Sequence, residues 1–494
     1  MALKINLFIF FIFFFLILLI NSVDADVNKT DKPNIIMIVA DDLGYNDVGF
    51  NGSLEIKTPN IDRIAKGGII FTHGYVTHSI CAPSRAAILT GKYQQKFGFE
   101  TNPSAIPNSG GVPNSEINLA EVLKMSGYKT AAIGKWHLGS GSNYSPNHRG
   151  FDYFFGFERG GSNYFPELLT LDSYSEVTER YGWYNLKILE NEKPVEINSY
   201  LTDELSSSAV EFVKKSKNSP FFLYLAYNAP HAPMQADPKV YDTIDIKDPS
   251  RRTYAAMVKS LDNGIGRVLD TLEELNLDNN TMVIFLSDNG GPESNFSDNG
   301  ILRGSKASPY EGGIRVPMAI KWPKVYPAGL SFDKNISSLD FFSTIIEAAK
   351  IDFPRKKNLD GINLTPCLID SECSALDRFL YFRSQAGWKV VLTPHSVKIV
   401  SHDILSKFKD TNTESYNLIN DPSEKYSDYK DHQHKYSDMI KNYQSWAQKL
   451  PGPAFSGLGN EGFPELTFLF RIKRKIKFII FQLDRNIKTY FGIY

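Results

Sequence analysis

The chain has 494 residues, more than a single hydrophobic core usually organises, so we expect one large domain and a smaller one. Its composition, 42% hydrophobic and 22% charged, is that of an ordinary soluble protein. The 54 basic and 55 acidic residues leave a net charge of -1, a balance that gives no support for a nucleic-acid binder, and we expect no nucleic-acid partner.

Residues 1–25 have the pattern of a signal peptide, in which Lys4 precedes an apolar run over 7–20 and a small-residue end. A retained membrane anchor is the alternative, but the run is shorter than the roughly 20 residues of a spanning helix. We therefore expect the mature chain to begin near Asp26 and to be secreted or lumenal, in a lysosome, outside the cell or in a periplasm. Glycosylation sequons fit this route and begin at Asn28, Asn51, Asn143, Asn279, Asn295, Asn335 and Asn363.

Four short apolar runs rich in β-branched and aromatic residues predict buried parallel strands: Asn34 to Ala40, Thr130 to Ile133, Phe221 to Tyr227 and Met282 to Ser287. Helical patterns lie between them, at Ile61 to Lys66, Ser84 to Thr90, Leu119 to Ser126, Ser206 to Lys215 and Arg252 to Glu274. This alternation predicts an α/β fold with a large central, mostly parallel sheet flanked by helices. Polar residues follow each strand closely, and functional groups collect at the carboxyl ends of such strands. We therefore expect one convergent site.

Beyond about residue 370 the alternation stops. Shorter segments predict antiparallel strands at Arg378 to Phe382, Lys389 to Thr393 and Ser396 to Val400, with a closing helix near Lys435 to Lys449. We interpret residues 371–455 as a smaller C-terminal α+β domain. The tail, 456–494, mixes apolar and aromatic residues with basic ones, and we favour a packed helix or a poorly ordered tail. Contact with a membrane surface or an anionic polysaccharide is the alternative.

The chain has three cysteines. Cys367 and Cys373 lie close enough in sequence to close a small loop as a disulfide, which leaves Cys81 as the odd one. A lone cysteine is ordinarily a buried, inert side chain. The context of Cys81 argues otherwise, because it opens the segment Cys81-Ala82-Pro83-Ser84-Arg85. Pro83 fits a helix start, where free N–H groups favour an anion.

This segment resembles the signature of the sulfatases, C-x-P-S-R, in which the cysteine is converted to formylglycine. Further segments match the family in order and context: Ile38 to Gly44, Thr58 to Asp62, Gly134 to Gly139, Leu286 to Gly291, Leu302 to Lys306 and Tyr310 to Pro317. The resemblance runs from about Lys32 to Pro323 and is greatest to arylsulfatase B and related polysaccharide sulfatases. It implies an alkaline-phosphatase-like fold and a catalytic sulfatase domain over 26–370 that hydrolyses sulfuric esters.

The resemblance also implies a metal site formed by Asp41, Asp42, Asp288 and Asn289 together with the modified Cys81. Apart from that modified side chain, these residues offer only oxygen ligands, which suit calcium or magnesium and argue against zinc. The family resemblance favours Ca2+ over Mg2+. Three carboxylates that converge without a cation would repel one another, so we expect such a site to be less stable or partly protonated.

The implied mechanism uses the hydrated aldehyde of residue 81. One hydroxyl attacks sulfur, and the other then loses its proton so that the aldehyde reforms and sulfate leaves. By resemblance, His137 is the base for this step, and Arg85 and Lys135 hold the modified side chain and the developing charge. His231 with Lys306 binds sulfate and protonates the departing alcohol. A formylglycine-generating enzyme is the implied partner during biosynthesis.

Two other functions are kept as alternatives. A phosphoryl hydrolase of the same superfamily would more often use a second metal, and the sequence shows no further His/Asp cluster to hold one. A noncatalytic binder of sulfated glycans would keep Cys81 unmodified. For the substrate we prefer a sulfated sugar or polysaccharide to a steroid or lipid. Aromatic residues of two loops, Phe151 to Pro166 and Tyr174 to Tyr184, would stack on sugar rings or else simply pack the loops.

Overall fold

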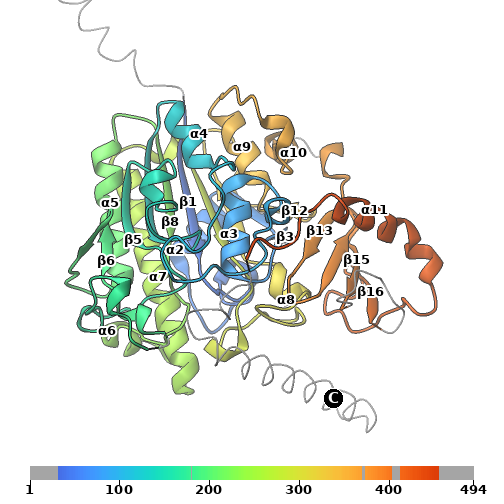
Figure 1. Cartoon of the computed structure of the whole chain (residues 1–494), viewed down its shortest axis with the longest axis horizontal. Coiled ribbons are helices and arrows are strands. Elements are labelled where there is room, and N and C mark those ends of the chain that lie inside the picture. Colours follow the sequence, from blue (N-terminus) through green and yellow to red (C-terminus); the bar gives the residue numbers. More distant parts are fainter. Residues whose placement is uncertain (1–31, 180, 370–372, 403–411, 456–494) are drawn as a thin grey trace, which may run out of the picture.

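A computed structural model describes residues 32–179, 181–369, 373–402 and 412–455. The predicted signal peptide and C-terminal tail lie outside the described residues. The largest element is a ten-stranded sheet (Figure 1). Its strands, from one edge to the other, are β11 (Leu330–Phe332), β2 (Ile69–Phe71), β10 (Met318–Lys321), β9 (Thr281–Ser287), β1 (Asn34–Ala40), β8 (Phe221–Ala226), β4 (Lys129–Lys135), β5 (Tyr153–Phe157), β6 (Ile188–Glu190) and β7 (Lys193–Val195).

The centre of this sheet is parallel, as expected. β9, β1, β8, β4 and β5 pair in parallel, whereas β10 runs antiparallel to β9, and β6 runs antiparallel to β5. Since β1 pairs with β8 on one side and β9 on the other, the carboxyl ends of these strands lie at one edge. The predicted parallel sheet is therefore confirmed, with short antiparallel strands added on both sides.

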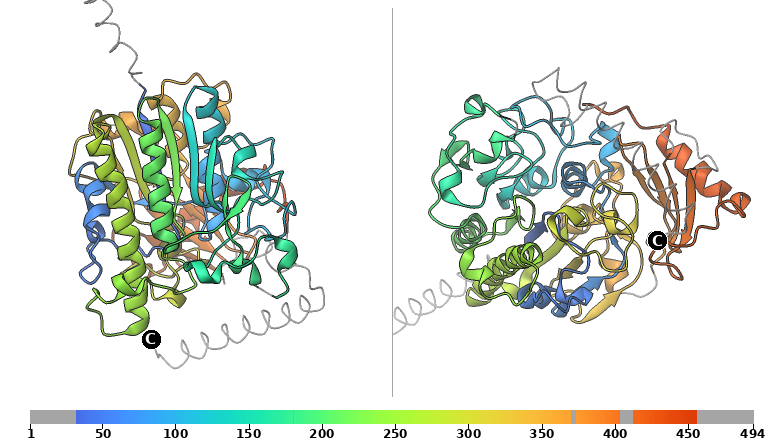
Figure 2. Two further views of the ribbon diagram at one scale, coloured as in Figure 1. Left: turned by 90° about the vertical axis from the view of Figure 1, so that its left-hand side faces the viewer. Right: turned by 90° about the horizontal axis from the view of Figure 1, so that it is seen from below.

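Helices cover both faces of the sheet (Figures 1 and 2). Alternate residues of β1 enter different cores: Met37 and Val39 join one, Ile36 and Ile38 the other. The first core is closed by α3 (Cys81–Thr90), α4 (Leu119–Met125), α9 (Asp340–Ala348) and α10 (Thr365–Ile369). The second is closed by α2 (Pro59–Lys66), α5 (Leu201–Ser216) and α7 (Pro249–Glu274). A strand buried on both faces explains the uninterrupted apolar sequence of β1.

Several helices begin earlier than the sequence predicts. α3 begins at Cys81, so Pro83 lies inside the first turn, where its missing N–H breaks no helical hydrogen bond. α7 begins at Pro249 because the side chain of Asp248 accepts a hydrogen bond of 2.7 Å from the N–H of Arg251. In α7 these N-terminal residues are proline, serine and arginine, which an apolar periodicity does not include.

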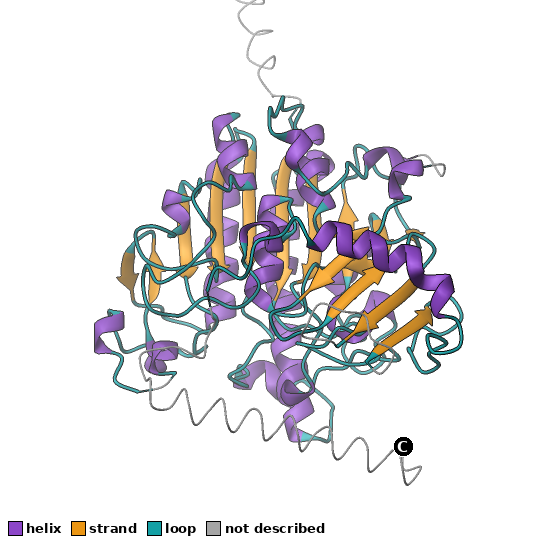
Figure 3. Cartoon of the chain, turned by 45° about the vertical axis from the view of Figure 1, so that its right-hand side comes forward, coloured by secondary structure: helices purple, strands orange, loops and turns teal. Residues whose placement is uncertain are grey.

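A separate four-stranded antiparallel sheet follows in the chain (Figure 3). It consists of β13 (Leu380–Arg383), β14 (Lys389–Leu392), β15 (Val397–Ser401) and β16 (Thr413–Asn417). Helix α11 (Ser437–Ala447) lies across one face, where Met439 and Tyr443 pack on Val391 and Ile399. The predicted α+β arrangement is confirmed, and β16 is a strand that the sequence analysis missed.

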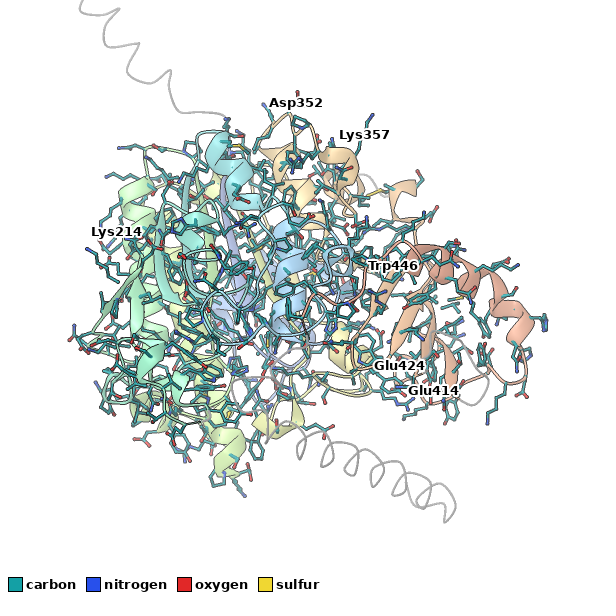
Figure 4. All side chains as sticks on the ribbon, viewed as in Figure 1. Lys214, Asp352, Lys357, Glu414, Glu424 and Trp446 are labelled. Carbon is teal, nitrogen blue, oxygen red and sulfur yellow. A yellow bond between two sulfur atoms is a disulfide. The ribbon has the colours of Figure 1, made fainter. Side chains whose placement is uncertain are left out.

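The other face of the small sheet packs on α8 (Glu311–Ile314) and on β3 (Gly74–Tyr75), which pairs with β12 (Ile336–Ser337). A buried group of charges, here called the interface triad, joins the two parts: Glu311, Lys398 and Glu424, the last labelled in Figure 4. The Lys398 Nζ lies 2.9 Å from Glu311 Oε1 and 2.8 Å from Glu424 Oε1. The Glu311 N–H donates to Glu424 Oε2 over 2.7 Å, so the triad closes on itself.

Two smaller points bear on the expectations from the sequence. Cys367 and Cys373 form the disulfide that their spacing allowed but the sequence left open, with Cα atoms 4.9 Å apart. Within the described ranges, no helix has the length and apolar character needed to cross a bilayer.

Candidate active site

The predicted site residues lie together at the carboxyl ends of the central strands. Asp41 and Asp42 follow β1 directly, Asp288 and Asn289 follow β9, and Lys135 ends β4. The remaining members come from other segments: Cys81 and Arg85 from α3, His137 from just beyond β4, His231 from the loop after β8, and Lys306 from the loop before α8. The structure thus brings together every residue that the sequence analysis selected, while their chemical roles stay predictions.

Cys81 is the first residue of α3, and only 1% of its surface is exposed. The next N–H of the helix, that of Ala82, donates to Asn102 Oδ1 over 3.1 Å, which fixes this helix end. Burial raises the pKa of the Cys81 thiol, but Lys135 and Lys306 outweigh it and lower the pKa to about 6. An unmodified Cys81 would therefore be largely thiolate at neutral pH.

Each of the three buried carboxylates is paired with its own cation. The Lys135 Nζ donates to Asp41 Oδ2 over 2.6 Å. The Arg85 Nε donates to Asp288 Oδ2 over 2.7 Å, and the Lys306 Nζ lies 2.7 Å from Asp42 Oδ1. The repulsion expected among the carboxylates is therefore largely offset by these pairs, a compensation that the sequence analysis did not foresee.

Two of these buried carboxyl groups have pKa values that are shifted in opposite directions. Burial raises the pKa of Asp42, but Lys306 and His231 outweigh it and hold the pKa well below the usual carboxyl range. Burial and the charge of Asp41 raise the pKa of Asp288, against the opposing charge of Arg85. Of these two carboxyl groups, only Asp288 shows the raised pKa that was expected from repulsion among the carboxylates.

The two histidines have opposite shifts. Burial, together with Lys135 and Arg85, lowers the pKa of His137 well below its usual value, which leaves a neutral ring able to accept a proton. Burial also lowers the pKa of His231, but Asp41 and Asp42 outweigh it and raise the pKa above its usual value. The His231 Nε2 lies 3.6 Å from Asp42 Oδ2. His231 therefore favours the protonated form and is suited to donate a proton.

The backbone conformation at Asp42 and His137, and a close glycine contact, fix the positions of these site residues. Asp42 and His137 have left-handed φ angles of 65° and 59°, a conformation that is costly for residues other than glycine. Gly160 lies against the His137 ring, and a Cβ there would be 2.9 Å from Nε2. Any larger residue at position 160 would displace the ring.

The oxygen atoms of the site can hold a metal ion. Buried Asp41 Oδ1 and Asn289 Oδ1 accept no hydrogen bond from any described residue. One ligand atom each from Asp41, Asp42, Cys81 and His231 lies within 4.8 Å of the others. This group shares three members with the predicted set and adds His231, whose raised pKa makes it a poor ligand because a protonated ring nitrogen has no free electron pair. Asp41 and Asp42 offer the oxygen donors that a hard cation prefers, whereas the sulfur of an unmodified Cys81 does not suit such a cation.

A cavity above Cys81 adds residues that the sequence analysis did not single out. It is lined by the predicted Cys81, His137, His231 and Lys306, and also by Asn102, Glu158, Arg159, Trp183 and Tyr184. Of these five additions, all but Asn102 lie in the two loops expected to contact substrate, and the segment that follows Asn102, residues 103–105, also lines the cavity. Asn102 follows no predicted strand and belongs to no matched segment, so nothing in the sequence marked it.

Comparison with known proteins agrees with the geometry. The family model "Sulfatase" matches residues 33–351, and that of the "N-sulphoglucosamine sulphohydrolase, C-terminal" region matches 305–449. The chain is 34% identical to human N-acetylgalactosamine-6-sulfatase over 74% of this chain and 70% of that protein. It is 30% identical to human steryl-sulfatase over 72% of this chain and 73% of that one.

Among solved structures, that of Ps i-CgsB in complex with k-i-k-neocarrahexaose has a TM-score of 0.80 and 38% identity, covering 86% of this chain and 94% of that chain. The fold is therefore the alkaline-phosphatase-like fold expected from the resemblance. From the family match and the placement of Cys81 among paired carboxylates, we conclude that the chain belongs to the sulfatase family and is a sulfuric ester hydrolase.

Proposed function

We propose that this sulfatase removes sulfate from a sulfated carbohydrate, with Cys81 converted to formylglycine as the source of the nucleophile. The observation that carries the proposal is the position of Cys81, buried at the first residue of α3, with ligand atoms of Asp41, Asp42 and His231 all within 4.8 Å. A hydrated aldehyde at this position supplies one hydroxyl to attack sulfur and a second whose deprotonation releases sulfate.

The residues around Cys81 have separate roles in proton transfer, some as acceptors and some as donors. His137, neutral because burial lowers its pKa, accepts the proton of the second hydroxyl. His231 and Lys306 both carry protons, since Asp41 and Asp42 raise the pKa of His231 and Asp42 raises that of Lys306 against burial. They protonate the departing alcohol, while Arg85 and Lys135 stabilise negative charge at residue 81.

We assign the cation to Asp41, Asp42, Asp288 and Asn289 and propose calcium, because the donors are oxygen atoms and two of them accept no hydrogen bond within the described chain. When bound, the cation polarises a sulfate oxygen. Magnesium is the second choice, and metal analysis of the purified protein distinguishes the two.

A carbohydrate is favoured over a steroid by two observations. One similar protein is an N-acetylgalactosamine-6-sulfatase, and one similar structure is a complex with k-i-k-neocarrahexaose, although a steryl-sulfatase also matches. Within the cavity, Trp183 and Tyr184 stack with ring centroids 4.2 Å apart and provide an aromatic wall of the kind that packs on sugars.

A secretory route is part of the proposal. Signal-peptide cleavage is expected near residue 25, and the Cys367–Cys373 disulfide suits an oxidising compartment. Of the sequons, Asn143 and Asn279 are exposed, whereas Asn295 and Asn335 are buried and cannot accept a glycan in the folded protein. Mapping of occupied sites on protein from a secretory host tests this.

The nucleophile is tested by two variants. Mass analysis of the wild-type peptide that contains Cys81 should show an aldehyde in place of the thiol. Cys81→Ser keeps one hydroxyl but lacks the second, so it should release about one equivalent of alcohol and stop as a sulfated serine. Cys81→Ala is the matched control and should show no burst. Steady turnover by Cys81→Ser near the wild-type rate would contradict the mechanism, and an unmodified thiol would favour a glycan-binding protein.

A further inference from the structure

Arg159 lines the cavity above Cys81 but has no place in the mechanism. The other cations of the site are matched by carboxylates: Lys135 by Asp41, Arg85 by Asp288 and Lys306 by Asp42. In the described part of the chain, no carboxylate lies within 4.0 Å of the Arg159 guanidinium, whose Nε is buried without a hydrogen-bond partner. Burial lowers the pKa of Arg159, and the nearby Glu158 carboxylate offsets this only in part, so the charge of Arg159 is only partly compensated within the cavity.

The position of Arg159 is nevertheless fixed. Its guanidinium lies over the ring of Tyr174, 5.7 Å from the centroid. The preceding residue, Glu158, is 7% exposed and accepts a hydrogen bond of 3.0 Å from the N–H of Gly141, which holds the backbone beside Arg159. The following residue, Gly160, packs against His137. The arginine therefore extends from a rigid segment directly beside a predicted catalytic residue.

A half-buried guanidinium without a carboxylate at ion-pair distance loses hydration and recovers little of that cost. Its planar, forked donors match the oxygens of a sulfate or a carboxylate, and stacking on a tyrosine leaves those donors free to bind in the ring plane. On the same cavity, Trp183 and Tyr184 present the aromatic wall, and Tyr184 is held in place by close contact with Gly161.

We infer that Arg159 is a specificity-determining residue that binds a second anionic group of the substrate, a sulfate or carboxylate on the sugar that bears the scissile sulfate or on its neighbour. The preferred substrate is therefore a carbohydrate with at least two negative groups, of which one is hydrolysed and the other is bound. This inference rests on the proposed carbohydrate substrate and narrows its class.

The test compares wild type with Arg159→Gln and Arg159→Lys on four substrates at fixed ionic strength: an aryl sulfate, a monosulfated disaccharide, a disulfated disaccharide and a monosulfated disaccharide that contains a uronate. For Arg159→Gln, we expect kcat/KM for a dianionic sugar, relative to the monosulfated one, to fall by about 10- to 100-fold through KM, as for loss of a charge-assisted bond. Arg159→Lys should recover part of the lost preference for the dianionic sugar. The disulfated and uronate substrates show which anion is bound.

Arg252→Gln is the matched control, since the Arg252 guanidinium also lies over a tyrosine, Tyr241, at 4.2 Å, and does not line the cavity. It should leave all four substrates unchanged. An unchanged ratio in Arg159→Gln, or equal loss on the aryl sulfate, would overturn the inference. If wild type cleaves only the aryl sulfate, the proposed carbohydrate function fails; competitive inhibition by the same sugars then still tests Arg159, because only dianionic sugars should lose affinity in Arg159→Gln.

Discussion

The active site and the interface triad are both groups of buried charges, but they differ in whether the protein itself supplies partners for all their oxygen atoms. In the active site, Asp41 Oδ1 and Asn289 Oδ1 accept no hydrogen bond from the described residues, although each carboxylate has a cation beside it. In the interface triad, Glu311 uses both oxygens, one toward Lys398 at 2.9 Å and one toward the Tyr75 hydroxyl at 2.8 Å.

The first group therefore has oxygen atoms with neither a hydrogen bond nor an ion pair, which leaves room for a further ligand. In the triad every carboxylate oxygen faces a donor or a cation of the protein: Glu424 Oε1, which accepts no hydrogen bond, lies 2.8 Å from the Lys398 Nζ. Buried polar atoms are almost always satisfied, so those that are not indicate a site for something the chain does not supply. Saturated buried charges instead join parts of a fold, here the four-stranded sheet and α8. Sequence does not distinguish the two groups, since both consist of acids and bases far apart in the chain.

Removing a metal ligand should produce the largest effect. Asp288→Asn keeps the shape of the side chain but removes a charge, so we expect kcat/KM to fall by about 10³-fold, since metal stabilisation contributes several kcal/mol. Calcium content should fall in parallel, measured by atomic emission, and the protein should stay folded but be less stable, because the buried Arg85 loses its carboxylate partner. Asp262→Asn, at a buried carboxylate that caps α2, is the control. Full metal content with full activity would remove Asp288 from the site.

The proton of His231 distinguishes catalysis from sulfate binding. His231→Ala should lower kcat on a sugar sulfate by about 10²-fold, because an alcohol of high pKa needs general-acid help. On an activated aryl sulfate the loss should be much smaller. The comparison is made under saturating substrate, with each variant's metal content checked. Equal losses on both substrates would assign His231 to sulfate binding.

The interface triad should respond in stability and not in chemistry. Lys398→Met leaves two buried carboxylates without their cation, so the free energy of unfolding should fall by about 3 kcal/mol or more, measured by urea denaturation. Metal content of the folded protein should be unchanged. The double variant Lys398→Met/Glu424→Gln should lose less, because only one unpaired carboxylate remains. A single variant as stable as wild type would show that the triad does not hold the sheet.

A pH dependence follows from the same triad. Burial and the charge of Glu311 raise the pKa of Glu424 from 4.5 to about 7, against Lys398. Because the folded pKa lies above the unfolded one, this contribution to stability is complete below about pH 4.5 and is lost as pH rises through 7. Between pH 5 and 8, wild type should lose up to about 1.4 kcal/mol per pH unit more than Glu424→Gln. Parallel stability curves for the two proteins would contradict the shift.

The sequence predicted the site better than its surroundings. The ligands and bases stand next to strand ends, and parallel strands bring their carboxyl ends together, so Asp41 and Asp288 were expected to meet although they lie far apart in the chain. β1 was predicted to the residue because a strand buried on both faces is uniformly apolar. Substrate-contact loops were also expected, but only as stretches of sequence.

What the sequence could not show depends on packing between distant segments. Lys398 sits among alternating residues of β15, where a lysine ordinarily faces solvent, and only the docking of the small sheet on α8 buries it. β10 is four residues long and is defined by its pairing with β9 and β2, and β11 is three residues long and is defined by its pairing with β2. Arg159 was one charged residue in a loop until the structure placed it in the cavity without a carboxylate at ion-pair distance among the described residues.

The burial of Cys81 has a consequence for the order of events in biosynthesis. With 1% of its surface exposed at the start of a packed helix, the side chain offers no access to a second protein once α3 has docked on the sheet. If Cys81 is converted as proposed, the converting enzyme acts on the nascent or unfolded chain. Protein produced without that enzyme would stay inactive after folding, and later addition of the enzyme would rescue it only if the chain were first unfolded.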